Sequence, residues 1–171
     1  MKYRRSRWKQ GSVYAIPLAD GSFGICQAID SMMKNIIYIA VFSYHFDEVP
    51  TEIPSLKKED ILSLGATWRQ HLNNGSWATI GVTDPIVEKR DFPNEAFAPS
   101  YVGAKHSDGG LFSKFLSACF GLRPWNTMAK EDYFEAYLNT NNRRPSKLKI
   151  LDPEARMKYR SEVLGIEAKF L

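Results

Sequence analysis

The first third of the chain alternates apolar with polar or small residues at the period of two that β-strands show. The runs 12–18, 23–29 and 36–44 carry this pattern and are rich in β-branched and aromatic residues. Asp20-Gly21 separates the first two runs, and such a pair favours a tight hairpin turn. A second turn is expected over 31–35. The pattern therefore predicts three sequential strands in an antiparallel meander.

The first predicted strand has two apolar faces. Odd-numbered residues from Val13 to Pro17 share one face, and even-numbered residues from Tyr14 to Leu18 share the other. Pro17 lacks the amide proton that a ladder hydrogen bond needs, so this strand is expected at a sheet edge or beside a bulge.

The pattern is weaker over the next part of the chain. The segment 47–60 is acidic, contains two prolines and is predicted to be a loop. A short strand or helical turn is expected over 61–64, and a strand is favoured over a helical turn for 66–72. Alternation over 76–83 predicts a strand with Trp77, Thr79 and Gly81 on one face.

Residues 84–110 are predicted to be mostly irregular, because prolines and glycines punctuate them. The period then changes to that of a helix. Apolar residues from Leu111 to Phe120 form a wide stripe that ends at Gly121. A second helix is expected over 127–138 with Thr127 as its N-cap. Asp152-Pro153 has the cap and first-turn proline that open a third.

These elements predict an α+β fold, in which a bent antiparallel β-meander, SH3-like or forming a small barrel-like sheet, precedes C-terminal helices. We expect one domain over 1–171. It comprises a basic N-terminal segment at 1–10, a β-rich part at 11–100 and a helical C-terminal part at 111–171.

Composition limits the class of protein. The 171 residues include 10 Phe, 8 Tyr and 4 Trp, which argues against disorder, and two distant cysteines cannot form a disulfide framework. The longest apolar run, 36–42, is about a third of the roughly 20 residues that a membrane span needs. The N-terminus is basic, but no sustained apolar stretch follows it. We expect a soluble, cytoplasmic protein with no membrane partner and with reduced cysteines.

No catalytic or metal-binding set stands out. Cys26 and Cys119 lie on apolar patterns typical of core residues, and the three histidines have no metal-ligand spacing. Gly109-Gly110 could offer amides to an anion, but a turn into a helix is the simpler interpretation. The sequence thus favours a binding protein, without cofactor, metal or catalytic residues, over an enzyme. A hydrolase using loop carboxylates such as Asp91 is the enzymatic alternative, which Asp91→Asn would test.

The charge is unevenly distributed. The net charge of +4 and the pI of about 9.0 suggest an anionic partner. However, residues 1–10 carry five basic and no acidic residues, and residues 143–171 carry eight basic and four acidic ones. The body at 11–142 has ten basic and fifteen acidic residues, a net charge of −5. A basic protein partner therefore suits the body, because complementary charge speeds encounter and disfavours wrong partners.

The basic ends leave an alternative function open. A small nucleic-acid-binding module could use them, with Trp8 stacking on a base. Its tails would have to converge on one face, so a nucleic-acid partner is disfavoured. The basic residues concerned are Arg4, Arg5, Arg7, Lys9, Arg143, Arg144 and Lys147.

Two elements, in this order, resemble a known family. The run Lys9-Gln-Gly-Ser-Val-Tyr-Ala-Ile-Pro-Leu-Ala-Asp-Gly-Ser-Phe-Gly-Ile-Cys-Gln-Ala-Ile29 has a glycine, a strand ending Ile-Pro-Leu, an Asp-Gly turn and an aromatic-Gly start to the next strand. Later come Trp77-Ala-Thr-Ile-Gly-Val-Thr-Asp-Pro85 and Phe92-Pro93. Together they resemble the immunity protein 26 family over residues 9 to 95. The helical part from Leu111 is not covered by the resemblance.

The resemblance implies an immunity protein of a bacterial polymorphic toxin or contact-dependent growth inhibition system. Such a protein is a stoichiometric toxin inhibitor and not an enzyme, and its toxin is often a nuclease. Tight interfaces set aromatic anchors within a polar rim. We therefore expect the acidic loops to contact basic residues of the toxin domain. The candidate partner-binding residues are Phe46, Asp47, Glu48, Asp84, Glu88, Asp91 and Phe92.

Overall fold

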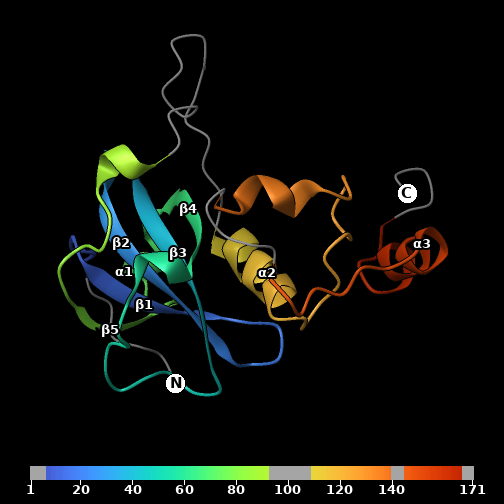
Figure 1. Ribbon diagram of the computed structural model, residues 1–171, viewed down its shortest axis with the longest axis horizontal. Coiled ribbons are helices and arrows are strands. Elements are labelled where there is room, and N and C mark those ends of the chain that lie inside the picture. The colour runs from blue at the N-terminus through green and yellow to red at the C-terminus, as the bar shows by residue number, and fades with distance from the viewer. Residues whose placement is uncertain (1–6, 93–108, 140–144, 167–171) are drawn as a thin grey trace, which may run out of the picture.

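The computed structural model describes residues 7–92, 109–139 and 145–166 (Figure 1). Its centre is an antiparallel sheet of five strands in the order β4-β3-β2-β1-β5. These are β1 (Ser12–Pro17), β2 (Phe23–Met33), β3 (Ile36–Phe46), β4 (Ile61–Trp68) and β5 (Ala78–Val82). The meander and the α+β class are confirmed, and the sheet is open instead of being closed into a barrel.

The first two hairpins follow the sequence pattern closely. β1 pairs with β2 from Val13 opposite Gln27 to Pro17 opposite Phe23, and β2 and β3 are longer than predicted, so only a short turn joins them. Irregularities interrupt the β2–β3 register at three places. Bulges of this kind bend a strand and increase its twist. They account for the strong curvature of the sheet in Figure 1.

Pro17 ends β1 opposite Phe23 of β2, and β1 lies between β2 and β5, so the expectation of an edge strand is wrong. β5 pairs with β1 only from Ser12 to Ala15, so no donor from Pro17 is needed on that side. The β1–β5 ladder also contains an irregularity, which places Gly81 opposite Val13 and Thr79 opposite Tyr14. Gly81 and Thr79 therefore lie on different faces, and the expectation that they share one is wrong because the irregularity shifts the alternation.

The region 61–73 divides differently from the prediction. β4 runs continuously to Trp68, and the next residues form a short helix, α1 (Arg69–Asn73). The apolar residues of 66–72 are divided between the two elements. Ala66 is a buried residue of β4, and Leu72 is a buried residue of α1. A strand over the whole of 66–72 is therefore wrong in its second half.

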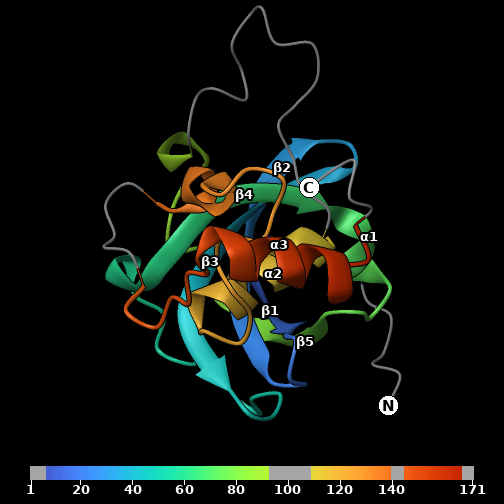
Figure 2. The same cartoon turned by 90° about the vertical axis from the view of Figure 1, so that its right-hand side faces the viewer.

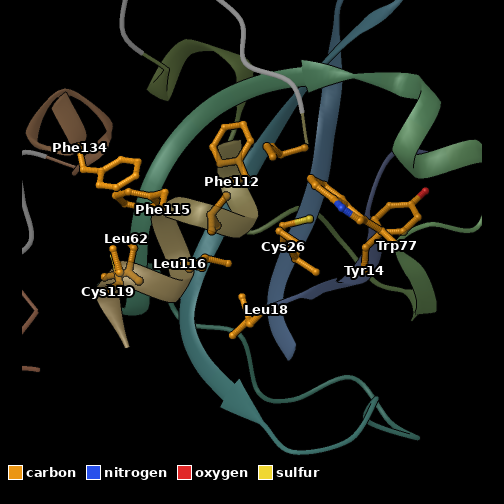
Figure 3. Close-up of a cluster of buried hydrophobic side chains, with 14 of the residues drawn as sticks. Tyr14, Leu18, Cys26, Leu62, Trp77, Phe112, Phe115, Leu116, Cys119 and Phe134 are labelled. Atoms are coloured by element: carbon orange, nitrogen blue, oxygen red, sulfur yellow. The ribbon is translucent and has the colours of Figure 1, made fainter. Parts of the chain in front are cut away.

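One side of the sheet, here called the helical face, is closed by helices and aromatic rings. α2 (Gly109–Cys119) lies against it, and α3 (Pro153–Glu162) lies on the far side of α2 (Figure 2). Phe112, Phe115 and Leu116 of α2 point into the cluster that Figure 3 shows. Burying a large apolar side chain of this kind contributes about 1.5–3 kcal/mol. The cluster also includes Leu18, directly after β1, and the strand residues Tyr14, Ile16, Cys26, Ala28, Ile37, Ile39 and Val41.

The opposite side, here called the loop face, is covered by irregular chain. Side chains from the segments 47–57 and 84–92 pack on strand residues that include Val13, Ile25 and Phe42. Both clusters follow the predicted alternation of β1, since Val13 and Ala15 face the loops while Tyr14, Ile16 and Leu18 face the helices.

The predicted helix over 127–138 is not formed. The chain makes turns and then the 3-10 helix η4 (Tyr133–Tyr137). The buried guanidinium of Arg156 on α3 donates hydrogen bonds to the backbone oxygens of Asn126, Met128 and Ala129. Carbonyls turned toward this side chain are not the i→i+4 acceptors of a regular helix, so a long-range contact overrides the local pattern. The predicted α3 is confirmed, and Asp152 caps it through the amide of Ala155 at 2.8 Å.

Candidate partner-binding surface

The structure gathers the predicted partner-binding residues on the loop face. Phe46 ends β3 and leads into Asp47 and Glu48, while the remaining residues lie between Asp84 and Phe92. These two stretches are almost forty residues apart in sequence, yet both contribute side chains to the cluster on the same face of the sheet. The carboxylates of Asp47, Glu48, Asp84, Glu88 and Asp91 are all on exposed residues.

A buried glutamine holds the start of the 84–92 segment. Gln27 lies on β2 with no exposed surface, and its side-chain nitrogen donates to the backbone oxygen of Asp84 at 3.0 Å. Its side-chain oxygen accepts from the amide of Ile86 at 2.9 Å. One side chain thus satisfies two peptide groups of residues 84–86, which belong to no strand or helix. This fixes the backbone beneath Asp84 and leaves its carboxylate exposed.

Apolar and cationic contacts hold the far end of the same segment. The ring of Phe92 lies 4.5 Å from that of Tyr38, and Phe92 is only 4% exposed. Lys89 Nζ donates to the backbone oxygen of Ser31 at 3.2 Å and lies 5.8 Å from the centre of the Tyr38 ring. Phe92 is therefore a core side chain, and the expectation that it is an exposed apolar anchor is corrected.

The acidic residues of the segment differ in how far local contacts engage them. Asp91 accepts a hydrogen bond from the amide of Glu88 at 2.8 Å across the short 3-10 helix η2 (Lys89–Asp91). Glu88 forms an ion pair with Arg90 at 2.8 Å, between two largely exposed side chains. Such exposed pairs contribute little to stability. Glu88 and Asp91 therefore have local structural contacts, whereas Asp84 is fixed through its backbone.

The segment 47–57 is held by a tyrosine of β3. The Tyr44 hydroxyl lies 2.8 Å from the backbone oxygen of Ser55 and 2.6 Å from Asp60 Oδ2. Burial, followed by the neighbouring Asp60 carboxylate, raises the pKa of Tyr44 to about 12. The tyrosine therefore stays neutral at physiological pH. Phe46 is half-buried against the same cluster, so part of its ring remains at the surface beside Asp47.

A groove of about 390 Å³ separates the two segments. Ile53, Pro54, Ser55 and Leu56 form one wall, while Val82, Thr83, Asp84 and Ile86 form the other. Gly81 brings the walls together, because a Cβ at this position would lie 2.9 Å from Cδ1 of Ile53. The groove thus has apolar sides and an exposed carboxylate, Asp84, at one wall. The sequence pattern predicted that both segments are loops, but it did not indicate that they line a common groove.

A second cluster that sequence reasoning missed contains Asp20, Ser22 and His45. The Ser22 hydroxyl donates to Asp20 Oδ1 and lies 2.7 Å from His45 Nε2. Hydrogen bonds from the Ser22 hydroxyl and amide, with the nearby His45, lower the pKa of Asp20. The only sequence signal was the turn at Asp20-Gly21, since Ser22 meets His45 through the β2–β3 pairing of Gly24 with His45.

This arrangement does not fit nucleophilic catalysis. In a serine triad the histidine accepts the serine proton and the carboxylate contacts the other ring nitrogen. Here the carboxylate accepts from the serine itself, and Ser22 is buried. The His45 ring instead stacks on Phe120 at 4.8 Å. The cluster ties the first hairpin turn to the end of β3 and to the residue that follows α2.

Metal and thiol chemistry receive no support from the described residues. Within 7–92, 109–139 and 145–166 no group of three His, Cys, Asp or Glu side chains could hold a metal ion. Cys26 and Cys119 are both buried, and burial raises the pKa of each thiol well above its usual range. A reactive thiolate is therefore disfavoured at either position.

Of the seven basic residues named for nucleic-acid binding, the structure describes three, and all three are exposed: Arg7, Lys9 and Lys147. The other four, Arg4, Arg5, Arg143 and Arg144, lie outside the described residues. Trp8 packs on the cluster of the helical face, and its amide donates to Asn73 Oδ1 at 2.7 Å. Its ring is thus partly engaged in packing. In the C-terminal part, Arg156 and Arg160 are buried.

No helix among the described residues is long and apolar enough to cross a membrane. In a comparison with known families, a family model described as immunity protein 26 matches residues 9–104, which is more than half of the chain. No curated protein and no solved structure matches. The match covers the whole sheet, the groove and both walls, and it confirms the resemblance that the opening strands and the Trp77 element indicate. The chain belongs to the immunity protein 26 family.

Proposed function

We propose that this immunity protein neutralises a cognate toxin domain by stoichiometric binding and that its loop face contacts the toxin. Family membership supports an inhibitory role. The observation that carries the choice of surface is the set of exposed carboxylates on the loop face, above a backbone that Gln27 and Tyr44 hold in place. Preorganised backbone lowers the entropy cost of binding.

The charge of this face suits a basic partner. The segments 47–57 and 84–92 together carry six acidic and three basic residues. A nuclease is the proposed target, because an enzyme that binds phosphates needs a positively charged surface. Acidic side chains of the immunity protein would meet that surface. The system is proposed to be a polymorphic toxin or contact-dependent inhibition system, with the protein acting in the cytoplasm of the producing cell.

Co-expression tests this function. The partner to use is the C-terminal domain of a large secreted protein encoded next to this chain. We expect that domain to stop growth alone and growth to resume when this chain is produced with it, with a 1:1 complex on size-exclusion chromatography. Absence of both binding and growth rescue would contradict the proposal for that pair. A mobility-shift assay at low salt with RNA and DNA is the control, since binding there would favour the nucleic-acid alternative.

A further inference from the structure

Hollows on the surface differ in how their charges are balanced. One of about 690 Å³, between β2 and the segment 84–92, has two acidic and two basic residues in its described lining. Another of about 350 Å³, beside the end of α2, has Glu59 and Lys147 in its lining. In the groove of about 390 Å³ between the segments 47–57 and 84–92, Asp84 is the one charged residue among the described residues that line it. This groove therefore has an unbalanced negative charge.

The carboxylate of Asp84 is not engaged by the rest of the described chain. Gln27 bonds the backbone oxygen of Asp84, while the exposed side chain has no hydrogen-bond or ion-pair partner among the described residues. By contrast, Asp91 accepts from the amide of Glu88, and Glu88 pairs with Arg90. The charge of Asp84 is thus available to a cation that a binding partner brings, and complementary charge of this kind favours the correct partner.

The walls of the groove are mainly apolar. Ile53 and Leu56 lie on one wall, and Val82 and Ile86 lie on the other. Ile53, Leu56 and Ile86 are half-buried against the cluster of the loop face, whereas Val82 is 57% exposed. A hydrocarbon chain placed between these walls would be favoured, because it would remove apolar surface from water.

Hydrogen bonds hold the backbone of both walls. The Tyr44 hydroxyl lies 2.8 Å from the backbone oxygen of Ser55 on one wall. On the other wall, the side chain of Gln27 bonds the backbone of Asp84 and Ile86. A groove that is formed before binding loses less conformational entropy when it is filled.

A long cationic side chain complements both features of this groove. Lysine and arginine have an apolar stem and a charged head, and the stem commonly packs on apolar surface while the head reaches a polar environment. Arginine is also enriched among the residues that contribute most to the affinity of protein interfaces. The volume of about 390 Å³ is near the lower end of the roughly 300–1,000 Å³ of ligand pockets, which suits one side chain better than a whole secondary-structure element.

We propose that this groove receives one lysine or arginine side chain of the toxin domain, with its stem between Ile53, Leu56 and Ile86 and its charged head on Asp84. The inference rests on the proposed function and names an anchor residue of that interface by its chemistry. Asp84 selects a cation, and the apolar walls select a long side chain over a short one.

A double-mutant cycle tests the charge contact. Each lysine and arginine of the toxin domain encoded next to this chain is replaced in turn by methionine, which keeps an unbranched apolar stem and removes the charge. Each toxin variant is titrated against the native chain and against Asp84→Asn. We expect one position at which methionine weakens binding to the native chain at least about tenfold but weakens binding to Asp84→Asn less than about threefold. If no basic position of the toxin domain is coupled to Asp84 in this way, the anchor is overturned.

Two variants at Val82 test the apolar walls. Val82→Trp adds bulk to one wall without changing the charge, and Val82→Thr is the matched control with a β-branched side chain of similar shape. We expect Val82→Trp to weaken binding at least about tenfold and Val82→Thr to change it less than about threefold. Equal affinity of a folded Val82→Trp and the native chain would refute burial of the stem.

The cycle at Asp84 decides the matter even if Val82→Trp does not fold. A toxin domain that binds the native chain without any coupled basic residue would refute the groove while leaving the immunity function intact. Failure of the native chain to bind the toxin domain at all would instead refute the proposed function.

Discussion

The two faces of the sheet are closed by different chemistry. On the helical face, apolar rings interlock: Phe115 lies within about 6 Å, centre to centre, of Trp125, Phe134 and Tyr137. On the loop face, apolar side chains also pack on the sheet, but the backbone of the irregular chain is bound by polar side chains, chiefly Gln27 and Tyr44. The helical face therefore contributes mainly stability. On the loop face, the backbone is held in place while the outward side chains contribute little to folding. These side chains can therefore vary to suit a binding partner.

The largest effect is expected from the helical face. Phe115→Ala removes a fully buried ring from the aromatic cluster and is expected to lower the free energy of unfolding by about 3–5 kcal/mol. Urea denaturation measures this. Phe120→Ala is the control, because this ring is only half-buried, and a loss of about 1 kcal/mol is expected. Equal losses of unfolding free energy for the two variants would contradict the conclusion that the buried rings of the helical face contribute most of the stability.

The glutamine anchor is expected to have an intermediate effect. Gln27→Leu leaves the backbone oxygen of Asp84 and the amide of Ile86 without their partner and should lower the free energy of unfolding by about 1–3 kcal/mol. Hydrogen exchange should show faster exchange at Ile86. The same change at the exposed Gln70 is the control, with a shift within about 0.5 kcal/mol. Slow exchange at Ile86 in Gln27→Leu would show that other contacts hold the segment.

Tyr44→Phe is expected to lower the free energy of unfolding by about 0.5–1.5 kcal/mol at pH 7, since the Ser55 oxygen and Asp60 lose a hydroxyl partner. The effect depends on pH. The pKa of about 12 in the folded protein lies above the usual tyrosine value of 10.0, so the stabilisation is complete below pH 10 and is lost as pH rises toward 12. Denaturation at pH 7 and pH 11 should show a smaller difference between native and variant at pH 11. A larger difference there would contradict the assignment.

The smallest effect on folding is expected from the exposed carboxylates. Asp84→Asn should change the free energy of unfolding by no more than about 0.5 kcal/mol, because the backbone of Asp84 and not its side chain is bonded to Gln27. Thermal unfolding with Glu162→Gln on α3 as the matched control checks this. A loss above 1 kcal/mol for Asp84→Asn alone would show that this carboxylate is structural.

The sequence predicted the parts of the fold that depend on local alternation. The meander and both faces of β1 follow from period-two patterns, because a strand between two apolar layers must present both Val13 and Tyr14 to a core. The N-cap of α3 at Asp152 could also be predicted, because the capping contact joins residues that are close in sequence. In contrast, the helix predicted over 127–138 is not formed, and Arg156, nearly thirty residues later, donates to the backbone oxygens of Met128 and Ala129 within this segment.

The candidate site was predictable in composition but not in geometry. Acidic residues and prolines in the sequence identified both segments as loops. That the two loops lie on one face depends on how the strands pair, which the local pattern does not show. The burial of Phe92 on Tyr38 and the role of Gln27 are contacts between distant residues that no local pattern encodes. A buried glutamine within an apolar strand was the available signal, because such an amide must find hydrogen-bond partners.

Calorimetric titration of the neighbouring toxin domain into three forms of this chain tests most directly that the loop face binds the toxin. The forms are the native chain, Asp84→Lys and Glu162→Lys, the last carrying the same charge change on α3. We predict 1:1 binding to the native chain, at least tenfold weaker binding to Asp84→Lys, and less than twofold change for Glu162→Lys. Equal affinity of the native chain and Asp84→Lys, or a larger loss for Glu162→Lys, would contradict the account.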